Sequence, residues 1–124
     1  MRGRTGWWGV VLECPDAVAL ATFYSSILGW PVVRDEGDGA VVAKPDHDYY
    51  LSFDTTPDYV PPVWPAAAGS PRMMMHLDVE VDDLETAVAD AIELGATPAD
   101  FQPQSDVRVL LDPAGHPFCL YLDT

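Results

Sequence analysis

Near its start, the chain alternates hydrophobic and polar residues and then changes to helical spacing. Val10 and Leu12 have the two-residue spacing of a half-buried strand. Asp16 is suited to cap the N-terminus of a helix, and Gly29 to end it. Between them, hydrophobic residues recur with a period near 3.6: Leu20, Phe23, Tyr24, Ile27 and Leu28. The pattern predicts a strand followed by an amphipathic helix.

The same order of patterns returns in the second half. Leu77, Val79 and Val81 alternate with polar residues and predict a strand. The run Asp82-Asp83-Leu84-Glu85 offers a cap with an acid three residues on, resembling a capping box, and Gly95 ends the predicted helix. The hydrophobic positions of that helix are Leu84, Ala87, Val88, Ala91 and Leu94.

Short strand-like runs separated by turns follow each helix. Asp38-Gly39 and Asp112-Pro113-Ala114-Gly115 are turn signals. The predicted strands are 30–35, 40–43 and 49–54 in the first half, and 97–101, 107–111 and 118–122 in the second. Each half therefore reads β-α-β-β-β, which predicts an α+β fold made of two tandem βαβββ modules.

An internal repeat supports this division. With a shift of 67 residues, Asp16 falls on Asp83, and Leu51-Ser52-Phe53 falls on Phe118-Cys119-Leu120. We expect a single domain over 1–124, with module one at about 7–54, a proline-rich connector at 55–72 and module two at about 73–123. The prolines of the connector exclude a central strand, and both a lid over a pocket and a strap along a sheet edge fit it.

Composition narrows the function classes. The 124 residues include six Lys plus Arg against twenty Asp plus Glu, a formal net charge of −14. Nucleic acid and anionic membrane surfaces are therefore not expected partners, because their phosphates would be repelled. Two cysteines do not make a disulfide framework, and no apolar run approaches a membrane span or a signal peptide. We expect a cytoplasmic protein.

Three stretches carry a resemblance to a known family. They are Leu12-Glu13-Cys14-Pro15-Asp16, then Phe23-Tyr24 with Leu28-Gly29, and Asp112-Pro113-Ala114-Gly115-His116. In this order, within two βαβββ modules, they resemble the vicinal oxygen chelate superfamily of glyoxalase, bleomycin-resistance and dioxygenase proteins. The resemblance covers about residues 7–123. It implies a curved mixed sheet around a cup, with the helices outside, a small-molecule ligand in the cup and a homodimer.

Strand alternation predicts which side chains face that cup. Gly9, Val11 and Glu13 should face it, while Val10 and Leu12 should face the first helix. The candidate ligand-binding residues are Tyr50, Ser52, Tyr59, Trp64, His76, Asp78, Arg108, Cys119 and Tyr121. The alternation on the strand that holds Arg108 is ambiguous, so this side chain either clamps an anionic group of the ligand or lies outside among the acids.

The resemblance also implies where a metal would bind. Metal enzymes of this family hold their ion at four points, which correspond here to Gly9, Ser52, His76 and Cys119. The 67-residue shift links the same positions in pairs. His76 is the only good candidate ligand among them, since glycine has no side chain and serine binds divalent ions poorly. No cofactor is therefore expected, a divalent metal is the alternative, and classical glyoxalase I activity is not expected.

His76 and Cys119 are the candidate catalytic residues. His76 fits a buried histidine bonded to Asp78 or to backbone, and alternatively acid–base work or ligand contact. Cys119 fits a nucleophile if a base lies nearby, but a cysteine is more often a small buried hydrophobe. Three function classes stay open: a small-molecule-binding protein without the full metal site, a metal-dependent lyase, isomerase or dioxygenase whose unorthodox site includes His76, and an interaction module.

Overall fold

Hydrogen-bonded strands form two separate four-stranded mixed sheets, one in each half of the chain. The computed structural model describes residues 1–123. The first unit is Met1–Tyr59, and the second begins at Val60. This division falls inside the predicted connector 55–72. The α+β class and the two βαβββ modules are confirmed, whereas the cup that the resemblance implies stays a prediction.

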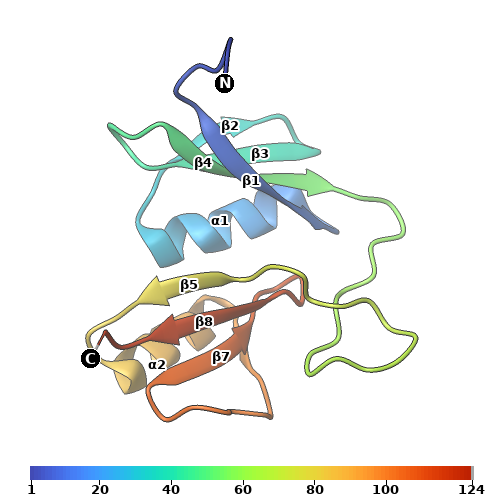
Figure 1. Ribbon diagram of the computed structural model, residues 1–124, viewed down its shortest axis with the longest axis vertical. Coiled ribbons are helices and arrows are strands. Elements are labelled where there is room, and N and C mark those ends of the chain that lie inside the picture. The colour runs from blue at the N-terminus through green and yellow to red at the C-terminus, as the bar shows by residue number, and fades with distance from the viewer. Residues whose placement is uncertain (124) are drawn as a thin grey trace. The chain divides into compact units, whose positions relative to one another are not determined.

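In the first unit, one helix and four strands follow one another along the chain in the predicted order. The elements are β1 (Trp8–Cys14), α1 (Ala17–Leu28), β2 (Val32–Asp35), β3 (Gly39–Ala43) and β4 (Tyr49–Thr55). The sheet has the order β1-β4-β3-β2, in which β1 and β4 are parallel and the other pairs antiparallel. Figure 1 shows α1 covering one face of this sheet.

The second unit repeats that topology. Its elements are β5 (Leu77–Glu80), α2 (Leu84–Leu94), β6 (Thr97–Pro98), β7 (Val107–Leu111) and β8 (Pro117–Tyr121). The sheet has the order β5-β8-β7-β6, with β5 and β8 parallel. Val10 pairs with Leu51 and Leu77 with Phe118, a separation of 41 positions in both units. The 67-residue repeat is therefore confirmed by the strand register.

The helix caps agree with the sequence prediction except in one detail. Asp16 accepts a hydrogen bond from the Ala19 amide at 3.1 Å, and Gly29 ends α1 with a left-handed φ of 71°. Asp83 caps α2 by accepting from the Thr86 amide at 3.1 Å. The capping box from Asp82 to Glu85 is wrong, because the extended residue at the helix start is Asp83, so that Thr86 takes the third helical position.

The two helices bury side chains of different size. Leu20, Phe23 and Tyr24 of α1 are almost fully buried, and the Tyr24 ring stacks on Phe53 with centroids 5.7 Å apart. In α2 only Ala91 is buried. No helix among residues 1–123 is both long and apolar enough to cross a membrane.

Strand alternation divides each sheet into a core face and an exposed face. In β1, Cys14 is buried and Val10 and Leu12 are half-buried, whereas Val11 and Glu13 are exposed. In β8, Phe118 and Leu120 are buried and Cys119 is half-buried. The alternation predicted for Val10 to Glu13 of β1 is confirmed, and Cys119 of β8 lies on the face opposite Phe118 and Leu120.

The connector packs against loops of the second unit. Val63 and Arg72 form an isolated parallel bridge, and the Trp64 ring lies 5.8 Å from that of Phe101. A Cβ placed on Gly115 would lie 2.8 Å from the Cβ of Pro61. Gly115 also has φ 90°, so only glycine suits this turn.

Candidate functional site

The first unit has a hollow of about 400 Å³ on the exposed face of its sheet. Trp7 and Tyr50 supply its aromatic surface, with ring centroids 6.4 Å apart. Ser52 lies in it, and Arg34 at its side carries an ion pair to Glu36 at 3.8 Å. We call this hollow the aromatic concavity. It can hold a flat apolar group by ring contact.

The Tyr50 ring also limits which side chain can stand at position 9. These two residues are register partners on β4 and β1. A Cβ placed on Gly9 would lie 2.4 Å from Cε2 of the Tyr50 ring. The ring therefore occupies the space that a metal-ligating side chain at residue 9 would need. A larger side chain at residue 9 would therefore require the Tyr50 ring to move.

The second unit has a smaller hollow, of about 340 Å³, on the equivalent face of its own sheet. His76, Asp78, Cys119 and Tyr121 line it, together with Asp106 and Gln104. Asp78 and Cys119 are register partners on the parallel strands β5 and β8. We call this hollow the donor concavity, because its side chains offer nitrogen, oxygen and sulfur.

His76 lies at the open edge of that hollow. Its side chain is 38% exposed, and its Nε2 lies 3.1 Å from Oδ1 of Asp78. The contact with Asp78 is the one weighed from the sequence, but the burial that went with it in that interpretation is not found. His76 precedes the first residue of β5, so the sheet covers it on fewer sides than a residue in mid-strand.

The Cys119 thiol resists ionisation. Burial raises the pKa of this thiol to about 11, and the negative charge of Asp78 and a hydrogen bond with it act in the same direction. The thiol is therefore protonated at neutral pH. A role as a free nucleophile is disfavoured, since the thiolate is the reactive form.

His76, Asp78 and Cys119 bring three possible metal donors together. One donor atom from each lies within 4.8 Å of the other two. Imidazole nitrogen, carboxylate oxygen and thiolate sulfur are all ligands of zinc. We call these three residues the donor cluster.

Three other predicted ligand-binding residues lie elsewhere. The Arg108 guanidinium donates to the carbonyls of Gln104, Ser105 and Val107, at 2.8–3.2 Å. Its register partner Leu120 is in the core, so Arg108 does not point into the donor concavity as one interpretation expected. Trp64 packs on Phe101, and neither it nor Tyr59 lines either concavity.

Arg34 and Asp106 line the concavities but were not among the predicted site residues. A register shift between Val32 and Arg34 on β2 places Arg34 opposite Val41. Such an irregularity changes the alternation that a sequence pattern relies on. Asp106 lies in the loop before β7, where no period predicts the direction of a side chain.

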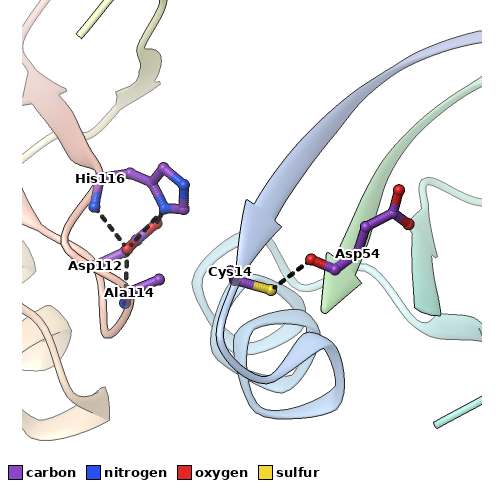
Figure 2. A network of polar contacts seen from close by, with 5 residues as sticks. All are labelled: Cys14, Asp54, Asp112, Ala114 and His116. Carbon is purple, nitrogen blue, oxygen red and sulfur yellow. Dashed lines mark hydrogen bonds and ion pairs between the residues drawn. The ribbon is translucent and has the colours of Figure 1, made fainter. Parts of the chain in front are cut away.

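His116, the last residue of the third family-like stretch, stabilises the turn between β7 and β8. Its Nδ1 donates to Oδ2 of Asp112 at 2.8 Å, and the same carboxylate accepts from the amides of Ala114 and His116 (Figure 2). Asp112 is 4% exposed. The figure also shows the Cys14 thiol donating to the carbonyl of Asp54. Both contacts hold the backbone in place.

Comparison with known proteins identifies the family. The glyoxalase-like domain family matches residues 9–121, nearly the whole chain. The protein therefore belongs to that family, within the glyoxalase/bleomycin-resistance/dioxygenase superfamily. Comparison with the curated proteins gives no match.

Solved structures of the superfamily share the fold at low sequence identity. A glyoxalase/bleomycin resistance protein/dioxygenase family enzyme from Burkholderia phytofirmans is 18% identical, with a TM-score of 0.65 over 92% of this chain and 95% of that one. The fosfomycin resistance protein FosX from Mesorhizobium loti is 12% identical, with a TM-score of 0.65 over 100% and 94%. The antibiotic binding protein TnmS3 from Streptomyces sp. CB03234 is 18% identical, with a TM-score of 0.55 over the whole of both chains.

Proposed function

We propose that this protein binds a flat, aromatic small molecule, neutral or cationic, in the aromatic concavity of its first unit. The observation that carries the proposal is the pairing of Trp7 and Tyr50 around a hollow of about 400 Å³. Ligand pockets are usually concave and aromatic, with a few polar groups that orient the ligand. Ser52 and Arg34 supply such groups here.

Charge favours this class of ligand. The formal net charge of −14 repels anions, and the ion pair with Glu36 offsets the positive charge of Arg34. A structural neighbour, TnmS3, is described as an antibiotic binding protein. That description agrees with a binding role for the fold, and the ligand of this chain is assigned on its own residues.

Calorimetry and tryptophan quenching with acridine orange, a planar aromatic cation, test the proposal. The planar anion 2-naphthalenesulfonate is the charge control. Trp7→Ala and Tyr50→Ala should each lower the affinity for acridine orange by about tenfold or more, because each removes a stacking surface. Trp8→Ala is the matched control: Trp8 is 57% exposed against 56% for Trp7, but it packs on Tyr49.

If Trp7→Ala, Tyr50→Ala and Trp8→Ala lowered the affinity for acridine orange equally, the ligand would not be bound in this concavity. An affinity for both probes no tighter than about 1 mM, a free energy near −4 kcal/mol, would also contradict the proposal.

The second candidate function is a metal-dependent lyase, isomerase or dioxygenase whose site includes His76. The donor cluster favours it. Glyoxalase-type isomerisation also needs a carboxylate base, and Cys119 stands where the resemblance places that base. Elemental analysis after metal supplementation, followed by assays with and without chelator, decides whether this candidate survives.

The proposal includes a homodimer in the cytoplasm. Cys14 and Cys119 are not joined by a disulfide, as suits a reducing compartment. Trp8 and Val33 are more than half exposed on the first unit, which offers apolar surface to a partner. Sedimentation equilibrium tests the assembly, and a mass of about 13.5 kDa at all concentrations would contradict it.

A further inference from the structure

The donor cluster of the second unit combines three different donor elements on one small surface. Asp78 and Cys119 lie opposite each other on the parallel strands β5 and β8. His76 precedes Asp78 by two positions, so alternation places both side chains on the same face. One donor atom from each of the three lies within 4.8 Å of the others. Separate segments of the sheet thus converge on one point.

We propose that His76, Asp78 and Cys119 bind one zinc ion within the second unit. The ion would be held by Nε2 of His76, a carboxylate oxygen of Asp78 and Sγ of Cys119. This site differs from the four-point arrangement that the family resemblance implies, because all three donors come from one module and Asp78 lies outside those four points. It is independent of ligand binding in the aromatic concavity.

The donor set selects the kind of metal. A thiolate and an imidazole favour borderline-soft ions such as Zn²⁺ or Co²⁺, whereas Mg²⁺ and Ca²⁺ prefer oxygen ligands. Three protein ligands with one open position is the usual arrangement of a zinc site that is not purely structural. Asp106 lines the same hollow and adds negative charge, which further favours a cation.

The cluster needs only a small adjustment to take the ion. Zinc bonds of about 2.0–2.3 Å place tetrahedral ligands roughly 3.3–3.8 Å apart. The donors here lie within 4.8 Å of one another. The side chains of His76 and Asp78 are 38% and 57% exposed, so both have room to rotate. In this rearrangement, bonds to zinc replace the 3.1 Å contact between His76 and Asp78.

Zinc binding releases one proton from the cysteine. The S–H bond of Cys119 breaks, its proton goes to water, and the sulfur forms a bond to zinc. His76 binds through a neutral imidazole, and Asp78 binds as a carboxylate. No electron is transferred and no other reactant is needed.

Metal titration of the full-length protein tests the site. Chelator-treated protein is titrated with Zn²⁺ against a chromophoric chelator, and separately with Co²⁺ while the thiolate-to-cobalt charge-transfer band is recorded. We expect one ion per chain and a near-ultraviolet band that Cys119→Ser abolishes. His76→Gln and Asp78→Asn should each lower the zinc affinity by about tenfold or more, and Mg²⁺ should not compete with zinc for the site.

His47→Gln is the matched control, because His47 is an exposed histidine of the first unit and should leave the zinc affinity within about twofold. Zinc should also protect Cys119 of the unaltered protein from alkylation, read by mass spectrometry of its peptide, so the test holds even if Cys119→Ser misfolds. A cobalt band that survives Cys119→Ser, an unprotected Cys119, or less than about 0.1 zinc per chain would overturn the proposal.

Discussion

Val11 and Ser52 face each other across the parallel strands of the first unit, and Asp78 and Cys119 occupy the same register in the second. The backbone arrangement is shared, but the chemistry is not. Two residues further back, the Tyr50 ring covers Gly9, and the corresponding residues of the second unit are Pro117 and His76. The repeat thus preserves the scaffold while each unit carries a different candidate site, an aromatic one and a metal-binding one.

The helices differ in the same way. With the 67-residue shift, Tyr24 of α1 corresponds to Ala91 of α2, and both are 1% exposed. A large ring fills the core of one unit where a methyl group suffices in the other. The contribution of each helix to stability should therefore differ.

Tyr24→Ala should cause the largest loss of stability among the proposed variants. It removes a buried ring that stacks on Phe53, so we expect the free energy of unfolding to fall by about 3–5 kcal/mol. The reverse change, Ala91→Leu, should overpack α2 and cost about 1–3 kcal/mol. Urea unfolding followed by circular dichroism measures both. A loss below about 1 kcal/mol for Tyr24→Ala would show that the two helices contribute alike.

The hairpin turns offer a second comparison. Asp112→Asn should cost about 1–3 kcal/mol, because the amide cannot accept all of the bonds that the buried carboxylate accepts from Ala114 and His116. Asp46, in the β3–β4 turn, is exposed, and Asp46→Asn should change stability by less than about 0.5 kcal/mol. Thermal unfolding of the two variants checks the difference, and equal melting temperatures would refute it.

Gly9→Ala tests the role of the Tyr50 ring. The added Cβ meets that ring at 2.4 Å, so we expect a loss of about 1–2 kcal/mol. In a Tyr50→Ala background the same change should be neutral or stabilising by about 0.5–1 kcal/mol, because alanine suits a strand better than glycine. A double-mutant cycle from urea unfolding measures the coupling. The same cost in both backgrounds would mean that the ring is not the obstacle.

The alkylation rate of Cys119 should depend on pH through the ionisation of its thiol. Because burial and Asp78 raise its pKa to about 11 from an ordinary 9.0, the rate should climb about tenfold per pH unit until about pH 11. Below pH 9 it should be about a hundredfold slower than that of an ordinary thiol. Asp78→Asn removes the negative charge and should lower the pKa. A plateau near pH 9 in the unaltered protein would contradict this account.

Local patterns were sufficient to predict most of the fold. Alternation and 3.6-residue spacing located both helices, and Asp16, Gly29 and Gly95 mark helix ends as predicted. The predicted strand 97–101 is shorter in the structure, where β6 covers Thr97–Pro98 only. Beyond it, the single bond from the Ala99 amide to the Val109 carbonyl continues the pairing.

The candidate sites could be predicted only in part. The repeat pairs Gly9 with His76 and Ser52 with Cys119, and the sequence places Asp78 among the candidate ligand-binding residues. No pattern predicted that the Tyr50 ring lies over Gly9, because a rotamer depends on its packing environment. The hydrogen bonds of Arg108 to three carbonyls could not be predicted either, because they depend on the shape of the loop before β7, which no sequence pattern indicates.

Residue-resolved NMR of the amide groups during a Zn²⁺ titration tests the contrast between the two units most directly. We expect the largest changes at 76–80 and 117–121 and smaller ones at 7–11 and 49–53, and we expect Mg²⁺ to cause none of them. Largest changes around Trp7 and Tyr50, or none at Asp78 and Cys119, would contradict this expectation.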